Sequence, residues 1–562
     1  MIGKILRKLK LKDVLKILIA LQCVVVFILA SVPPISRDAL THHLIIPKLF
    51  INHGGIYNIP EIVFSYYPMN LDLIYMIPLY FGNDIIPKYI HFSFALFTAF
   101  LIFFYLKKRI DSNFGLLGAL FFLSIPVIVK LSINVYVDLG LIFFSTTALL
   151  CLFKWVESEF IPKHLIFSAI CCGLALGTKY NGLIVFFILS CIVPFAYLRR
   201  SNDELFKIKL GNQFKAIGCG LIFVFISLLV FSPWMIKNYI LTQNPVYPLY
   251  NSWFNPKGIL TNDNRELNVF EKTDKKDEWS HFAVRKIVYR ETLWQIASIP
   301  VRIFFEGMDD DPKHFDGQLN PFLLLLALFA FFPGQTNPKK MYVTENKILF
   351  MFSILYLFFV FFQVDMRIRW VGPIIPPMVI LSMFGLERIQ RFGAGSERKK
   401  ILFNSTATII VSGMLLLNAR YIHALYLKVD PVPYISGQID RDNYIKKFRP
   451  EYEVIRYANQ HLPENALILG LFIGNRRYYF EKKVLLDVDL LKRAVLSSNS
   501  SGQIRKKLVS VGITHILMRY DLFNNWTEYN LAPENQILLN TFLSNRAKQL
   551  KSYGGYGLFE LM

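Results

Sequence analysis

The chain has 562 residues, of which 54% are hydrophobic, 15% aromatic and only 18% charged, and its formal net charge is +22. The apolar residues form long uninterrupted runs, which excludes an ordinary soluble protein of this length. The Lys and Arg residues occur as short clusters between these runs and not as one basic face. They therefore indicate anionic lipid headgroups and membrane orientation, and nucleic acid is excluded as the expected partner.

The first apolar run predicts an uncleaved membrane anchor. It continues to about Val32, and several Lys and Arg residues lie before it and at its start. About 20 apolar residues are enough to cross a bilayer. The following Pro33-Pro34 pair is not a small-residue cleavage site. We therefore expect the N-terminus in the cytoplasm and the residues after Val32 outside.

Further runs have the length and apolarity of membrane spans. They lie near residues 86–106, 114–131, 137–153, 164–177, 181–198, 216–234, 319–333, 347–364, 371–386 and 401–418. With the anchor, the fold class is a polytopic α-helical membrane protein with about eleven transmembrane helices. This count puts every strong basic cluster in the cytoplasm, as the positive-inside rule requires. These clusters are Lys107-Lys108-Arg109, Arg199 to Lys209, Lys339-Lys340 and Arg388 to Lys400.

Three segments then face outward. Residues 33–85 read as interfacial helices and turns, since the apolar stretch from Met69 to Phe81 is too short to span and contains Pro78. Residues 235–318 are polar enough to form a folded loop. Residues 420–562 offer short strand candidates at 466–472, 484–488, 513–518 and 556–561 between amphipathic stretches, which predicts a soluble α/β domain. The expected domains are a transmembrane domain over 1–419 and an external domain over 420–562.

Ionisable residues gather at the external ends of the predicted spans. Asp38 follows the first span, Asp138 begins the fourth, Lys179 lies between the fifth and sixth, Lys237 ends the seventh, and Arg367 and Arg369 lie between the ninth and tenth. Charges near a bilayer are costly unless they are paired or functional. This arrangement predicts a site that binds an anion with cations and uses a carboxylate as general base.

Several short motifs together resemble a known family. They are the acid opening the first external loop, the Asp heading the fourth span, Gly177-Thr178-Lys179-Tyr180-Asn181-Gly182, and Pro233-Trp234-Met235-Ile236-Lys237-Asn238-Tyr239 followed by Asn244-Pro245-Val246-Tyr247-Pro248. In this combination the chain resembles integral-membrane glycosyltransferases of the GT-C type, in the branch of protein O-mannosyltransferases and lipid A aminoarabinose transferases. The resemblance implies a polyprenyl-phosphate sugar donor, transfer on the external or periplasmic side, and a glycan, lipid or protein acceptor.

The resemblance also implies roles for individual residues. Asp38 is the expected general base, with inversion at the anomeric carbon, and Asp138 orients the acceptor or supports Asp38. Departure of the lipid phosphate develops negative charge that fixed cations stabilise, and the candidates are Lys179, Arg369, Arg367 and Lys237. The candidates for contact with the sugar or the isoprenyl chain are His42, Tyr66 and Tyr67, together with Tyr75 and Tyr80. No cofactor is expected.

Each role has a structural alternative. Asp38 and Asp138 are also good helix N-caps, and Lys179 and Lys237 are placed where lysines extend toward headgroups. Arg367 and Arg369 alternate along the chain, so we expect only one to face the site. The resemblance favours Arg369, because the family pattern places a basic residue just before the aromatic residue and the Pro of the next span.

A metal and a different function are the remaining alternatives. His42 and His43 with Asp38 offer a partial metal site, and the acidic run from Glu306 to Asp316 loosely resembles a calcium loop without its regular spacing. A polysaccharide or lipid transporter, or an assembly protein without transferase activity, also explains many spans. A transporter of this kind is expected to show paired halves with broken helices at matching positions.

Overall fold

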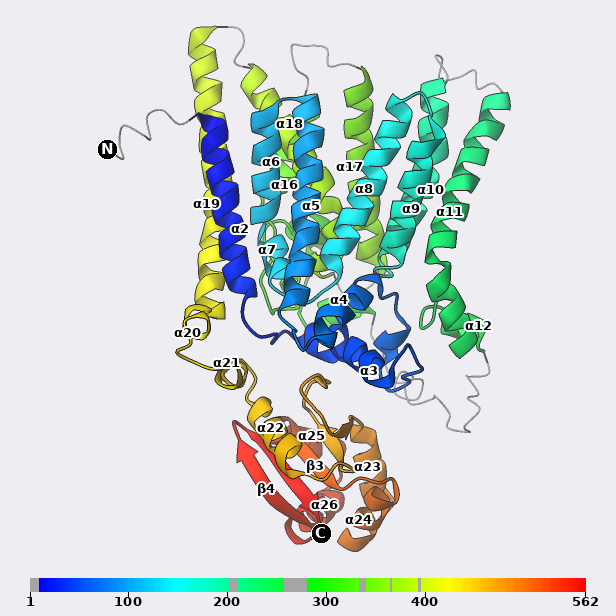
Figure 1. The fold of residues 1–562 in the computed structure, drawn as a ribbon, viewed down its shortest axis with the longest axis vertical. Helices are drawn as coiled ribbons and strands as arrows, with labels where there is room; N and C mark the ends of the chain where they lie inside the picture. Colours follow the sequence, from blue (N-terminus) through cyan, green and yellow to red (C-terminus); the bar gives the residue numbers. More distant parts are fainter. Residues whose placement is uncertain (1–9, 202–209, 257–279, 333–339, 364–365, 393–395) are drawn as a thin grey trace. The chain divides into compact units, whose positions relative to one another are not determined.

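The computed structural model describes residues 10–201, 210–256, 280–332, 340–363, 366–392 and 396–562. The chain divides into two compact units (Figure 1). The first, which we call the membrane unit, consists of Met1–Ala30, Ile56–Pro78 and Ile86–Asp430. The second consists of Ser31–Gly55, Leu79–Ile85 and Pro431–Met562, and we call it the external unit after the side of the membrane that the sequence analysis expects for it.

The described residues of the membrane unit form helices joined by loops, and none of them forms a strand. Its helices are α2 (Leu11–Ala30), η2 (Val63–Tyr66), α4 (Asn70–Tyr80, which reaches into the external unit), α5 (Ile86–Arg109), α6 (Ser112–Ser124), α7 (Pro126–Ser132), α8 (Asp138–Glu157), α9 (Pro162–Leu176), α10 (Gly182–Ser201), α11 (Leu210–Thr242), α12 (Asn251–Phe254), α13 (His281–Ile287), α14 (Leu293–Ala297), α15 (Ile299–Arg302), α16 (Phe322–Phe329), α17 (Lys340–Gln363), η3 (Ile368–Ile374), α18 (Ile375–Arg391) and α19 (Glu397–Val429).

The number of full spans is lower than the sequence predicted. Among the described residues, 8 helices are long and apolar enough to cross a membrane, or 9 if α6 and α7, bent by 66° at their junction, count as one span. The two predicted spans that are too short to cross a membrane as helices are α9, with 15 residues, and α16, with 8 residues. At about 1.5 Å per residue, α16 covers roughly 12 Å of a hydrocarbon layer of about 30 Å. Apolar length in the sequence overestimated the helical length of these two segments.

The bundle has polar groups at two opposite ends. At one end, Arg109 of α5 lies 3.0 Å from Glu157 of α8 and 2.7 Å from Glu345 of α17. At the other end of α5 and α8, the His91 ring accepts a hydrogen bond from the Leu139 backbone N–H at 3.0 Å. The basic cluster that predicted orientation and the ionisable site candidates therefore belong to different ends of the same helices.

Close contact of helices requires small residues at two crossings. A Cβ on Gly385 of α18 would overlap the backbone carbonyl of Leu326 in α16, and a Cβ on Gly173 of α9 would lie 2.6 Å from the Ser227 carbonyl oxygen in α11. Helix α9 packs against α8, α10 and α11 (Figure 1). This packing holds the turn between α9 and α10 next to the first residue of α8.

Helix α4 lies where the sequence predicted an interfacial helix. Leu71 and Tyr75 are fully buried, whereas Ile74 and Ile77 on the other side are exposed. A helix that lies at a bilayer surface presents a row of uncovered apolar side chains to the lipid. The exposed side of α4 has this character.

The external unit contains a five-stranded sheet with strand order β2-β1-β3-β5-β4. Its strands are β1 (Leu467–Leu471), β2 (Lys483–Leu485), β3 (His515–Arg519), β4 (Ala547–Tyr553) and β5 (Tyr556–Leu561), and its helices are η1 (Ala39–His43), α3 (Ile45–His53), α20 (Val432–Ile435), α21 (Arg441–Phe448), α22 (Glu451–His461), α23 (Val488–Leu496), α24 (Ser501–Ser510), α25 (Tyr520–Asn530) and α26 (Pro533–Arg546). β1 pairs in parallel with β2 and β3, and β5 pairs antiparallel with β3 and β4.

Both faces of the central strands β1 and β3 are buried. Leu469 and Ile516 pack on one face with Leu508 of α24, and Ile468 and Leu517 pack on the other with residues of α22. The alternation follows from the period of two along a strand. Four of the strands lie where the sequence predicted them. β4 was missed because it is an edge strand with the polar sequence AKQLKSY.

The boundary of the external unit differs in detail from the expected division. Helix α19 runs to Val429, so the boundary expected between residues 419 and 420 falls inside this helix. The external unit also takes in residues 31–55, which contain Asp38. A segment that sequence order assigned to the transmembrane domain is therefore part of the same compact unit as the C-terminal sheet.

The helix crossing at Gly385 gives a stability prediction. We expect Gly385→Ala to destabilise the protein by about 1–3 kcal/mol, because the added methyl group overlaps rigid backbone and α16 and α18 must separate. Gly413→Ala in α19 is the matched control, since its Cβ would lie 3.8 Å from the nearest atom, in the Phe322 ring, and alanine favours a helix. Thermal unfolding in detergent compares the two variants, and equal melting temperatures would contradict the packing described.

Candidate active site

A buried ion pair lies at the start of α8. Asp138 is the first residue of the helix and 2% exposed, and its Oδ1 is 2.6 Å from the Nζ of Lys179 in the turn between α9 and α10. The N-cap position of α8 is Val137, so the interpretation of Asp138 as a helix cap is wrong. The alternative that Lys179 extends toward headgroups is also wrong, because its ammonium group contacts a buried carboxylate.

Arg369 and His91 belong to the same cluster. Asp138 interacts electrostatically with Lys179, Arg369 and His91, and the Arg369 guanidinium lies 5.4 Å from the centre of the Tyr136 ring. We call Asp138, Lys179, Arg369 and His91 the Asp138 cluster. It combines a buried carboxylate with two basic side chains and a buried imidazole at the end of an apolar bundle.

His91 fixes the backbone at the start of α8. The ring is fully buried, and its Nδ1 lies 3.0 Å from the Leu131 carbonyl oxygen while its Nε2 accepts from the Leu139 N–H. These partners require a neutral imidazole that carries its proton on Nδ1. The sequence reasoning missed His91. The available signal was a histidine inside an otherwise apolar span.

Arg367 points to a different group. Its guanidinium lies 3.8 Å from Asp316 and 5.5 Å from the centre of the Trp370 ring. Backbone geometry explains the separation from Arg369, since Arg367 has an extended conformation and Ile368 begins a 3-10 helix. Of the two arginines, Arg369 is the one that lies with Asp138.

Lys237 binds a backbone carbonyl. Its Nζ donates to the Ser65 carbonyl oxygen at 2.6 Å and lies 5.0 Å from the centre of the Trp234 ring. The alternative that it extends toward headgroups is wrong for this reason. Among the residues that the structure describes, no carboxylate lies within ion-pair distance of this ammonium group.

The motifs that carry the family resemblance pack together. Trp234 donates to the Asn70 side chain at 2.8 Å, and the Asn70 N–H donates to the Gly177 carbonyl at 2.9 Å. A Cβ on Gly177 would lie 2.3 Å from the Asn70 side-chain nitrogen, so a larger residue there would displace the Asn70 amide that Trp234 contacts. Asn238 donates to the Tyr66 carbonyl at 2.8 Å and lies 3.1 Å from the Tyr180 hydroxyl. Much of the motif therefore serves to hold residues 65–70 against α9, α10 and α11.

The tyrosines of the first loop differ in accessibility. Tyr66 is 2% exposed and its hydroxyl donates to Asn58, and Tyr75 is fully buried and donates to the Tyr136 carbonyl. The expectation that Tyr66 and Tyr75 stack on a substrate is wrong, because protein atoms cover their rings. Tyr67 is partly exposed, with its ring 5.2 Å from that of Tyr180. Tyr80 is exposed.

Asp38 lies in the external unit, at a local distortion of the helix. Its φ of −66° and ψ of −34° are helical and its side chain makes no capping hydrogen bond, so the helix-cap alternative is wrong. The next residues form the π-helix η1, closed by a hydrogen bond from Leu44 N–H to the Ala39 carbonyl at 3.0 Å. Single π-turns occur frequently at functional sites. His42 and His43 follow, with their ring centres 4.1 Å apart.

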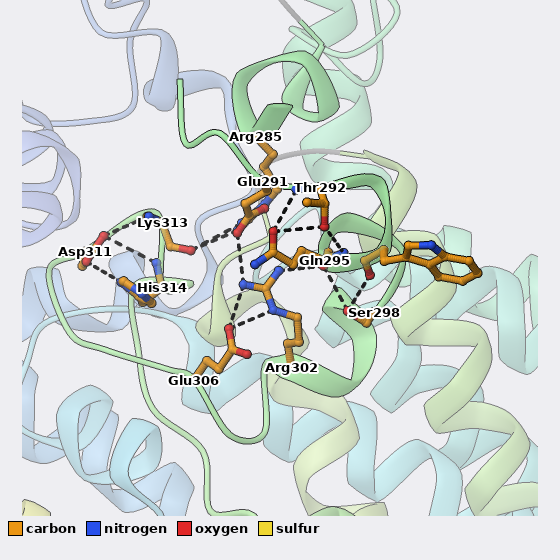
Figure 2. A network of polar contacts seen from close by, with 11 residues as sticks. Arg285, Glu291, Thr292, Gln295, Ser298, Arg302, Glu306, Asp311, Lys313 and His314 are labelled. Carbon is orange, nitrogen blue, oxygen red and sulfur yellow. Dashed lines mark hydrogen bonds and ion pairs between the residues drawn. The ribbon is translucent and has the colours of Figure 1, made fainter. Parts of the chain in front are cut away.

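The carboxylates of the acidic run form ion pairs with basic side chains. Glu306 pairs with Arg302, and Asp311 pairs with His314 (Figure 2). The nitrogen–oxygen distances of these two pairs are 2.7 Å and 2.6 Å. Further along the run, Lys130 reaches Asp309, Asp310 and Asp316 within 3.5 Å. In the described part of the chain, no group of three or more His, Cys, Asp or Glu residues is placed to hold a metal ion.

Solved structures show which fold this is. The chain superimposes on the crystal structure of ArnT from Cupriavidus metallidurans bound to undecaprenyl phosphate, with a TM-score of 0.55, 11% identity and 97% of each chain covered. It is also similar to an oligosaccharyltransferase from Archaeoglobus fulgidus tethered to an acceptor peptide, with a TM-score of 0.50, 9% identity, and 96% of this chain and 74% of that chain covered. The chain therefore has the fold of the GT-C membrane proteins.

The sequence itself points to the same class. Residues 56–242 match the family of dolichyl-phosphate-mannose-protein mannosyltransferases. No curated protein sequence matches the chain significantly. The match over residues 56–242 agrees with the resemblance found in the sequence, and the solved structures confirm the GT-C fold predicted there.

The Asp138 ion pair gives a second stability prediction. We expect Lys179→Met to destabilise the protein by about 3 kcal/mol, because it leaves a buried carboxylate without its closest cation. The double variant Asp138→Asn with Lys179→Met is expected to recover most of this loss, because the buried carboxylate and its closest cation are then removed together. Thermal unfolding of Lys179→Met, Asp138→Asn and the double variant tests this. A loss in the double variant equal to the sum of the losses in the two single variants would contradict the pairing.

Proposed function

We propose that the chain transfers a sugar from a polyprenyl-phosphate carrier to a hydroxyl of a glycan, lipid or protein, on the external face of a plasma or inner membrane. The observation that carries the proposal is the Asp138 cluster, in which one buried carboxylate lies beside Lys179 and Arg369. Lys179 and Arg369 are thus two basic side chains at one buried position, and basic side chains of this kind bind phosphate.

The leaving group explains why this arrangement favours transfer. Breaking the bond between the anomeric carbon and the phosphate oxygen leaves a phosphate with increased negative charge, which prearranged cations stabilise as it develops. Arg369 offers a planar fork of donors suited to phosphate, and Lys179 offers a single ammonium group. Asp138 has a supporting role, because it holds both cations in place before the donor arrives.

Asp38 is assigned as the general base. As the acceptor oxygen attacks the anomeric carbon, its proton passes to the Asp38 carboxylate, the sugar–phosphate bond breaks, and polyprenyl phosphate leaves. One displacement of this kind inverts the anomeric configuration. The π-helix η1, which begins at the residue after Asp38, supports the assignment, because such turns occur frequently at functional sites.

The role of Asp38 is tested by Asp38→Asn. We expect release of polyprenyl phosphate from a labelled donor to fall by at least about 100-fold, because the amide cannot take the proton. Thr41→Val is a matched control in the same segment, since Thr41 contacts His42 and the Asp38 carbonyl without carrying charge. Turnover in Asp38→Asn equal to that of the wild type would remove Asp38 from the mechanism.

The phosphate site is tested by comparing the two arginines. We expect Arg369→Lys to weaken binding of polyprenyl phosphate by about tenfold, because a lysine has no bidentate fork. Arg367→Lys, which changes a residue beside Asp316, is expected to leave the dissociation constant unchanged. Equal effects of the two substitutions in a binding titration would argue against a specific role for Arg369.

A further inference from the structure

We propose that the C-terminal part of the chain contributes positioning residues to the reaction: Tyr479 and Arg449 hold the segment that carries Asp38. The inference rests on the proposed role of Asp38. It gives the external unit a function that differs from acceptor recognition, because these side chains act on the catalytic segment of their own chain.

Contacts from the C-terminal part lie on both sides of Asp38. Before it, the Tyr479 hydroxyl donates to the Pro34 carbonyl oxygen at 2.7 Å, and the Arg449 Nε donates to the Ile35 carbonyl oxygen at 2.6 Å. After it, the backbone N–H groups of Arg477 and Tyr478 both lie 3.2 Å from the Leu40 carbonyl oxygen. The backbone is thus fixed four and three residues before Asp38 and two residues after it.

A second set of contacts holds the helix that follows. Lys48 of α3 donates to the Tyr478 carbonyl oxygen at 3.1 Å and lies 5.3 Å from the centre of its ring. The Tyr478 hydroxyl in turn donates to Asp84 at 3.1 Å, and Arg441 contacts the same carboxylate at 2.5 Å. The segments around residues 38, 84 and 478 are therefore joined by one connected set of hydrogen bonds within the external unit.

The loop that provides these donors is itself fixed. It connects β1 to β2, and positive φ angles at Phe472, Gly474 and Asn475 turn it sharply after β1. Asn459 of α22 donates to the Tyr479 carbonyl at 2.9 Å, and Arg476 forms a 2.6 Å ion pair with the buried Glu451. Donors on such a loop are prearranged, which is what an accurately placed catalytic group requires.

The Tyr479 hydroxyl remains a donor over the working pH range. Burial first, and the Asp84 carboxylate second, hold the pKa of Tyr479 well above its ordinary value. The carbonyl groups that it and Arg449 satisfy belong to largely buried backbone, where an unmade hydrogen bond costs about 1–3 kcal/mol. Loss of either donor therefore favours movement of the chain on the N-terminal side of Asp38.

The test is a kinetic double-mutant cycle in the full-length protein. We expect Tyr479→Phe to lower kcat about tenfold, and Tyr479→Phe with Arg449→Gln about 100-fold, with KM for the labelled polyprenyl-phosphate sugar within twofold of the wild type. In an Asp38→Asn background, Tyr479→Phe is expected to cause no further loss, because there is no base left to position.

Two variants in the same region serve as controls. Tyr452→Phe removes a hydroxyl that donates to Asp442, and Arg456→Gln removes a guanidinium that contacts Glu453 and Asp442, so neither changes a donor to residues 33–43. Both are expected to keep the wild-type kcat. Amide hydrogen exchange at residues 39–44 provides an independent measure, and we expect it to be faster in Tyr479→Phe and unchanged in Tyr452→Phe.

The outcomes separate this inference from the proposed function. If Asp38→Asn lowers kcat but Tyr479→Phe does not, the positioning role is wrong and the function stands. If Tyr479→Phe lowers kcat to the same extent in the Asp38→Asn background, its role is general stability and the inference is overturned. If Asp38→Asn turns over like the wild type, the proposed base is wrong, and the positioning of a base fails with it.

Discussion

The structure of the membrane unit depends on the buried contact between Asp138 and Lys179. A carboxylate at the head of an apolar helix is costly unless a cation meets it, and here the cation comes from a turn 41 residues away in the chain. Bringing that turn to α8 requires α9 to pack closely on α8, α10 and α11. The same arrangement brings Arg369 to the pair. The ionic constraint and the helix packing thus specify one geometry.

Much of the family motif explains this packing and not the chemistry. Trp234, Lys237 and Asn238 all bind the segment from Ser65 to Asn70, two of them through its backbone carbonyls. Lysine and asparagine near a span end therefore identify a place where the first loop is attached. Some motif residues hold the site together and others are placed to act on the substrate. Only the contacts in the structure show to which group a residue belongs.

Hydropathy predicted the helical class, most span positions and four of the five strands, because these follow from local periodicity. It did not predict that α16 is only 8 residues long, because the apolar composition of a segment does not determine where the helix ends. Topology placed Asp138 and Lys179 at the same face of the membrane. Their direct ion pair, the separation of Arg367 from Arg369 and the role of His91 depend on tertiary contacts. The burial of Tyr66 and Tyr75 could not be predicted for the same reason, because an aromatic residue in a loop is equally suited to a core or a ligand.

The most direct test of the account is a structure of the protein with bound polyprenyl phosphate. The account predicts that the phosphate oxygens lie within about 3 Å of the Lys179 ammonium group and the Arg369 guanidinium, since charge-assisted hydrogen bonds have this length. A phosphate bound elsewhere, with Lys179 still on Asp138 and Arg369 still over Tyr136, would contradict the assignment of this cluster as the donor site.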